Sequence, residues 1–96
     1  MTTKQTYLNI LQKFKQEYAE KYGIERIGLF GSIARGEHTD QSDVDVVVEA
    51  PKLGYEVVSL RLDLEETFGK PVDLVTGFSC KSERFKNRVE REVIYV

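Results

Sequence analysis

Features that mark exported and membrane proteins are scarce in this sequence of 96 residues. The one cysteine, Cys80, cannot form a disulfide within the chain, which favours a reducing compartment. No apolar run approaches the roughly 20 residues of a membrane-spanning helix, and no apolar signal segment follows Met1. We therefore expect a cytoplasmic protein that has no contact with a membrane.

The chain also lacks a strong net charge. Its 14 Lys and Arg residues against 16 Asp and Glu residues give a net charge of −2, and direct nucleic-acid binding usually needs a basic domain. The charge is uneven, because residues 36–75 hold ten acidic and three basic side chains, whereas residues 81–92 hold five basic and three acidic ones. The acidic middle suggests a cation site. The basic segment could meet phosphates or an acidic partner, although charges on a helix more often face solvent.

The length is that of one small domain. We expect residues 1–96 to form a single domain, because a chain of 96 residues has no room for a second, substrate-binding domain. The composition, 41% apolar and 31% charged, is typical of a globular protein.

Apolar spacing and glycine stops predict alternating helices and strands. The predicted helices are residues 4–22, a short turn at 33–35 with Ser32 as its N-cap, residues 53–68, and residues 79–92 starting at Ser79 or Ser82; the predicted strands are residues 26–30, 43–49 and 71–76. The order is α-β-α-β-α-β-α. The fold class is therefore α/β, a small three-stranded sheet flanked by helices.

Residues 53–68 fit two patterns. Apolar and polar side chains alternate from position 58 to 65, as in a strand, but apolar side chains also repeat at intervals of three and four along one helical face. A segment of 16 residues exceeds a usual strand, so we predict a helix. Val58 and Leu62 lie beside its main apolar stripe, and we expect them to be buried against the core and a partner.

Two acidic residues open the second strand. Side chains two apart on a strand share a face, so Asp43 and Asp45 are expected to point the same way. Two carboxylates that close repel each other unless a cation lies between them, and Mg²⁺ commonly binds one or two carboxylates together with substrate phosphates. Taken alone, the pair is about as well explained as two exposed acids at the entry of a strand as it is by a Mg²⁺ site.

Gly31 and Ser32 follow the first strand and could bind phosphate. Glycine lets a phosphate approach the backbone, and the amides of the short turn and the Ser32 hydroxyl can donate to its oxygens, although an isolated Gly-Ser is more often a plain turn. Asp73 lies on the third strand. If residues 53–68 form a crossover helix, the second and third strands are parallel and Asp73 lies beside the acid pair, where it could bind a second metal ion or take a proton; otherwise it is an edge-facing acid.

These motifs resemble a known family. Gly31-Ser32, ten further residues and then Asp43-x-Asp45 are similar to the signature of the DNA polymerase β-like nucleotidyltransferase superfamily. The segments 31–37, 42–48 and 70–76 resemble more narrowly the minimal nucleotidyltransferases (MNT), which are antitoxin partners of HEPN-domain toxin ribonucleases in prokaryotes. The resemblance extends over nearly the whole chain to its closing Arg-Glu-Val-Ile-Tyr-Val.

The resemblance implies a mixed sheet and a role for each site residue. It implies that Asp43 and Asp45 hold two Mg²⁺ ions on ATP, and that Gly31 and Ser32 cradle its β- and γ-phosphates. Asp73 would be a third metal ligand or the general base. Arg35 and Ser42 also match the family motif as nucleotide-binding residues, although Arg35 could equally cap the loop.

The resemblance further implies transfer of AMP from ATP to a hydroxyl of the cognate HEPN toxin encoded nearby, with tyrosine as the acceptor and a hetero-oligomer as the working form. The short length agrees with an acceptor on another chain. One alternative is a non-catalytic antitoxin that blocks the toxin by contact. Another is a nucleotidyltransferase acting on RNA or a small molecule, for which a basic groove would be expected.

Overall fold

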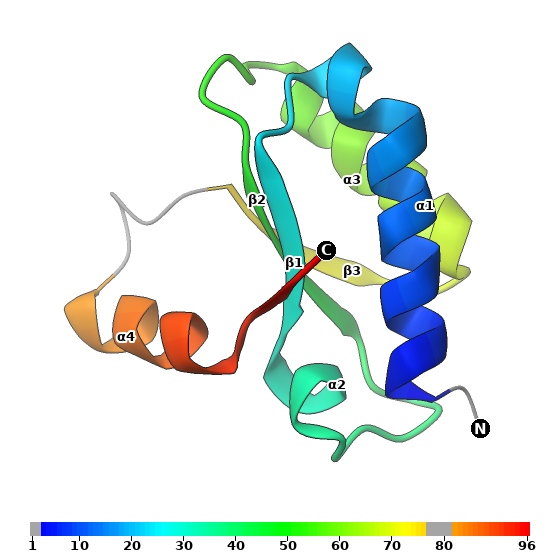
Figure 1. Cartoon of the computed structure of the whole chain (residues 1–96), viewed down its shortest axis with the longest axis vertical. Coiled ribbons are helices and arrows are strands. Elements are labelled where there is room, and N and C mark those ends of the chain that lie inside the picture. The colour runs from blue at the N-terminus through cyan, green and yellow to red at the C-terminus, as the bar shows by residue number, and fades with distance from the viewer. Residues whose placement is uncertain (1–2, 77–81) are drawn as a thin grey trace.

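The computed structural model describes residues 3–76 and 82–96, and it shows a sheet with helices on both sides (Figure 1). The elements follow the order α1 (Lys4–Tyr22), β1 (Arg26–Phe30), α2 (Gly31–Arg35), β2 (Val44–Glu49), α3 (Glu56–Phe68), β3 (Val72–Val75), α4 (Glu83–Glu92) and β4 (Ile94–Tyr95). The predicted α/β class and the order of its first seven elements are confirmed. Within the described ranges, no helix is both long and apolar enough to cross a membrane.

The sheet is mixed and has the strand order β3-β2-β1-β4. β1 is antiparallel to β2 and to β4, whereas β2 is parallel to β3. The prediction of three strands was wrong, because Ile94 pairs with Leu29 and Tyr95 with Gly28. A two-residue strand is too short to show a periodic pattern. Gly28 allows the pairing, since a Cβ at this position would lie 2.7 Å from the carbonyl oxygen of Ile94.

The two faces of the sheet carry separate apolar clusters. α1 and α3 cover one face, and α4 lies on the other side (Figure 1). The larger cluster includes buried side chains of α1, α3 and three alternate valines of β2; the smaller cluster consists of Phe30, Val47, Val75 and Val89, with Phe85, Val93 and Tyr95 packed against it. Because side chains alternate along a strand, Asp45 lies on the same face as Val47, the face covered by α4.

Several boundaries follow the predicted capping residues. Gly23 ends α1 with a φ of 66°, and the Ser82 side chain accepts a hydrogen bond from the Phe85 amide at the start of α4. Ser79, the other predicted start, lies outside the described residues. The Ser32 cap was wrong, because α2 begins two residues earlier than predicted, at Gly31, and Phe30 is its cap residue, with no side-chain cap bond.

The helix prediction for residues 53–68 is confirmed, although α3 begins at Glu56. The expectation that Val58 and Leu62 pack against the core of this chain was wrong, because Val58 is 63% and Leu62 56% exposed. Their burial against a partner stays a prediction.

Candidate functional site

The sheet brings two of the predicted acids into direct register. Asp45 of β2 pairs with Asp73 on the parallel strand β3, and on its other side Asp45 pairs with Phe30 at the end of β1. The expectation that Asp73 lies beside Asp45 through a parallel crossover is therefore confirmed. Asp43 precedes the first residue of β2 and is exposed, as is Asp73, whereas Asp45 is half-buried.

The surroundings of Asp45 hold an excess of negative charge. The pKa of Asp45 is raised to about 6, first by burial and then by the negative charges of Asp73 and Asp43, while Arg35 and Arg88 act in the opposite direction. Asp43 and Asp73 are therefore both close enough to act on Asp45. A cation at this position would favour the ionised form of Asp45.

This donor set fits magnesium that is shared with a phosphate ligand. Among the residues that the structure describes, no group of three or more His, Cys, Asp or Glu side chains is placed to hold a metal ion by itself. Mg²⁺ usually needs only one or two carboxylates, because water and substrate phosphates supply the remaining ligands. The hard oxygen atoms of Asp43, Asp45 and Asp73 suit such an ion.

Gly31 is packed directly against the central acid. Its φ is 75°, and a Cβ built on it would lie 2.1 Å from Oδ2 of Asp45 and 2.9 Å from Cγ. No side chain fits there unless the carboxylate moves. Sequence reasoning assigned Gly31 to phosphate approach, whereas the structure shows that glycine is also required for the position of Asp45.

Glu92, a further carboxylate that contacts Gly31, was not identified from the sequence. The amide of Gly31 donates to Oε2 of Glu92 over 3.2 Å, although 61 residues separate the two in the chain. Nη1 of Arg35 donates to Oε1 of Glu92 over 3.0 Å, and Nε of Arg88 donates to the same oxygen over 3.3 Å. The only signal in the sequence was the cluster of charges at residues 81–92, for which we favoured a solvent-facing helix over contact with phosphates or an acidic partner.

These contacts also determine the charge of Glu92. Burial would raise the pKa of Glu92, but hydrogen bonds from Arg88, the Gly31 amide and Arg35 outweigh it and hold that pKa below its usual value. Glu92 is therefore an ionised carboxylate close to Asp45, and two guanidinium groups and a backbone amide hold it in place.

The remaining predicted residues lie around this group. Ser32 is half-buried in the first turn of α2, next to Gly31. Arg35 also donates from Nε to Glu37 over 3.0 Å. Ser42 has a local contact, because its Oγ accepts a hydrogen bond of 2.9 Å from the Thr39 amide and shapes the loop before Asp43.

Comparison with known proteins identifies relatives over the full length of the chain. Residues 11–96 match the family described as nucleotidyltransferase domain. The chain is 42% identical over 99 residues to protein adenylyltransferase MntA of Thermococcus cleftensis, a match that covers 100% of this chain and 98% of that protein. It is 39% identical over 100 residues to a Methanocaldococcus jannaschii protein assigned as a protein adenylyltransferase, with 100% of both covered.

Solved structures share the fold. A protein assigned as a minimal nucleotidyltransferase superposes with a TM-score of 0.79 at 29% identity, covering 97% of this chain and 95% of that one. A chain from a toxin–antitoxin structure with AMP-PNP gives a TM-score of 0.70 at 25% identity, covering 91% of this chain and 69% of that one. The resemblance drawn from the sequence motifs is confirmed by both kinds of comparison.

Proposed function

The chain belongs to the nucleotidyltransferase domain family, and from this premise we propose that it transfers AMP from ATP to a hydroxyl of a cognate toxin protein. The acceptor in this proposal is a tyrosine of a HEPN toxin ribonuclease encoded nearby. Full-length relatives named as protein adenylyltransferases support the reaction, and the structural neighbour from a toxin–antitoxin structure with AMP-PNP supports the substrate and the kind of partner.

One observation carries the proposal. The half-buried carboxylate of Asp45 is in register with Asp73 and lies against Gly31, so close that a Cβ on this glycine would meet it at 2.1 Å. The backbone turn proposed for phosphate and the carboxylates proposed for metal are therefore one site.

The binding roles follow from this placement. Gly31 and Ser32 would receive the β- and γ-phosphates of ATP, with the Arg35 guanidinium beside them and Ser42 shaping the loop before Asp43. Asp43 and Asp45 would hold two Mg²⁺ ions, and Asp73 would be either a third ligand of these ions or the general base. Bound there, the ions would neutralise phosphate charge and orient the attacking and leaving oxygens.

The transfer is a substitution at the α-phosphorus. The acceptor oxygen forms a bond to this phosphorus, the bond from the phosphorus to the bridging oxygen breaks, and pyrophosphate leaves with the bond's electron pair. The acceptor hydroxyl loses one proton, which the exposed Asp73 carboxylate can accept before releasing it to solvent. Ionised Asp45 and its neighbours hold the donor and acceptor in place, and positioning supplies much of the rate in reactions of this class.

The acceptor chain needs a surface to bind. The outer side of α3 exposes apolar side chains, because Val58 is 63% and Leu62 56% exposed and the preceding Tyr55 is 98% exposed. Exposed apolar patches of this kind often mark protein interfaces. The same patch would also serve an antitoxin that neutralises its toxin by contact alone, so the functional test has to separate binding from chemistry.

Variants of the acids separate the two functions. The reaction contains the neighbouring gene product, Mg²⁺ and ATP labelled at the α-phosphate. It is run with the purified wild-type protein, with the variants Asp43→Asn and Asp45→Asn, and with the control Asp40→Asn in the exposed loop. We expect label on the partner with the wild type and with Asp40→Asn, and a loss of label with the other two variants, whose complexes still form. Absence of label with the wild type, when it still neutralises the toxin, would refute the proposal in favour of contact alone.

A further inference from the structure

The carboxylate of Glu92 accepts hydrogen bonds from the groups that we propose bind phosphate. Its Oε2 accepts from the Gly31 amide over 3.2 Å, and its Oε1 accepts from Arg35 over 3.0 Å. These donors belong to α2, whereas Glu92 is the last residue of α4. One negatively charged side chain therefore reaches across from another helix to the turn that begins α2.

Glu92 lies between two arginine side chains, of which Arg35 also pairs with Glu37. The two guanidinium groups of Arg35 and Arg88 donate to the same oxygen of this single carboxylate, at 3.0 and 3.3 Å. The Glu92 side chain is 17% exposed, whereas Arg88 is 59% and Arg35 33% exposed, so these contacts lie at the surface and solvent partly screens them. Both guanidinium groups also act on Asp45, whose pKa they lower. The positive groups therefore lie near both carboxylates, where a phosphate beside Asp45 would find them.

A phosphate oxygen and Glu92 cannot use these donors together. The Gly31 amide has one hydrogen to donate, and two anions close to each other repel strongly where solvent is scarce. α4 is attached to the sheet through the buried Val89 and through Phe85, whose ring meets that of Phe30 edge-on. The Glu92 side chain, at the end of α4, can leave the donors by rotation or with a small shift of its last turn.

We propose that Glu92 is an internal competitor of the nucleotide: its carboxylate holds the Gly31 amide, Arg35 and Arg88 in the empty site and leaves them when the phosphates of ATP bind. Arg88 is then a phosphate-binding residue contributed by α4, in addition to Arg35. The inference rests on the proposed function, since it assumes that ATP is the ligand of this site.

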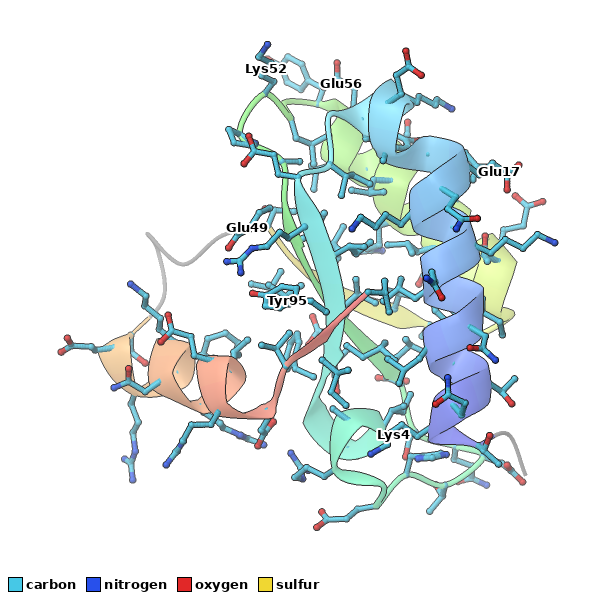
Figure 2. All side chains as sticks on the ribbon, in the orientation of Figure 1. Lys4, Glu17, Glu49, Lys52, Glu56 and Tyr95 are labelled. Atoms are coloured by element: carbon cyan, nitrogen blue, oxygen red, sulfur yellow. The ribbon has the colours of Figure 1, made fainter. Side chains whose placement is uncertain are left out.

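A second ion pair on the same face provides a matched control. Glu49 accepts from Nε and Nη2 of Arg26 at 2.8 and 2.5 Å, and this arginine also lies 4.4 Å from the centre of the Tyr95 ring. Figure 2 shows Glu49 and Tyr95 on the side of the sheet where α4 lies. Four residues along β2 separate Glu49 from Asp45, roughly 13 Å. Loss of the Glu49 charge therefore tests the general effect of breaking a carboxylate–arginine pair.

The first experiment measures ATP affinity by titration calorimetry in Mg²⁺ buffer. Glu92→Gln keeps an acceptor oxygen for the Gly31 amide and removes the charge. We expect it to bind ATP about fivefold more tightly than the wild type, the effect of removing one partly screened like charge, whereas Glu49→Gln binds as the wild type does. Equal or weaker binding by a folded Glu92→Gln variant would overturn the inference.

A second variant tests the role of Arg88. If Arg88 is transferred to the phosphates, Arg88→Gln weakens ATP binding, both alone and in combination with Glu92→Gln. If Arg88 only serves to hold Glu92, its removal frees the site and ATP binds more tightly, which contradicts the proposal.

Hydrogen exchange of the wild-type protein gives a readout that depends on no variant. ATP is expected to keep the Gly31 amide protected and to speed exchange in the last turn of α4, and unchanged exchange in α4 under saturating ATP would refute the displacement of Glu92. A wild-type protein that binds no ATP refutes the proposed function as well. One that binds ATP and transfers AMP, but is indifferent to Glu92→Gln, refutes this inference alone.

Discussion

Replacement of Gly31 by alanine should separate the stability of this protein from its activity, and Gly36 provides the matched control. Both glycines have a φ of 75°; Gly31 is the first residue of the short helix α2 and Gly36 is its C-cap. An alanine in this left-handed region costs about 1–2 kcal/mol at either position. The two variants therefore share the same backbone penalty.

The surroundings of the two glycines differ. A Cβ at Gly36 would have no neighbouring atom within 4 Å, whereas a Cβ at Gly31 would lie 2.1 Å from Oδ2, 2.9 Å from Cγ and 3.2 Å from Cβ of Asp45. The obstructing group is the end of a side chain that can rotate away. Its movement adds little to the loss of stability, but it takes the central carboxylate out of register with the proposed phosphate site.

Two assays measure these effects separately. Urea unfolding should show the two variants destabilised by similar amounts, about 1–2 kcal/mol each. AMP transfer to the partner should fall about a hundredfold in Gly31→Ala, as expected for a displacement of about 1 Å at a catalytic group, and should stay near the wild-type rate in Gly36→Ala. Equal transfer by both variants, at temperatures where both are folded, would refute the argument that Gly31 positions Asp45.

Two further predictions concern stability and its dependence on pH. Because the folded-state pKa of Asp45, about 6, lies above its ordinary value of 3.8, the stability that its proton contributes is complete below about 3.8 and is lost as the pH rises through 6. A pKa raised by about two units corresponds to about 3 kcal/mol of stability for a fully buried group, and the partial exposure of Asp45 reduces this to about 1 kcal/mol. In metal-free buffer, Asp45→Asn should therefore resist urea better than the wild type at pH 8 but not at pH 4. An advantage that does not depend on pH would contradict ionisation of Asp45 as its cause. Val89 is 1% exposed between α4 and the sheet, so Val89→Ala should lower the free energy of unfolding by about 2 kcal/mol and loosen α4 in hydrogen exchange, whereas Val58→Ala on the exposed side of α3 should change it by less than about 0.5 kcal/mol.

The elements that could be predicted from sequence are those with local signals. α1 has clear apolar periodicity, β2 is a run of β-branched valines that ends before Pro51, and glycines with positive φ end α1, α2 and α3 where a stop was expected. β4 could not be predicted, because two residues show no periodicity and its pairing with β1 joins distant parts of the chain. The start of α2 was misplaced at Ser32 because a serine cap is a common signal, whereas here the helix begins with glycine itself.

Among the site residues too, those with a local signal could be predicted from the sequence and the others could not. Gly31, Asp43 and Asp45 were recognisable from their spacing, and Asp73 could be added because a helix between two strands predicts a parallel crossover. Glu92 and Arg88 could not be found by this reasoning. No local pattern says that the last helix returns to the face that carries Asp45, or that one of its several charges reaches the Gly31 amide.

In the proposed reaction, this chain moves the α-phosphoryl group of ATP, as AMP, onto a partner protein. The most direct measurement follows two labels in parallel reactions of the wild-type protein, Mg²⁺ and the neighbouring gene product, with ATP labelled either at the α- or at the γ-phosphate. We predict that the α-label appears on a tyrosine of the partner and that the γ-label appears only in pyrophosphate. Transfer of the γ-label to the partner, or a partner that stays unlabelled while its toxicity is still neutralised, would contradict it.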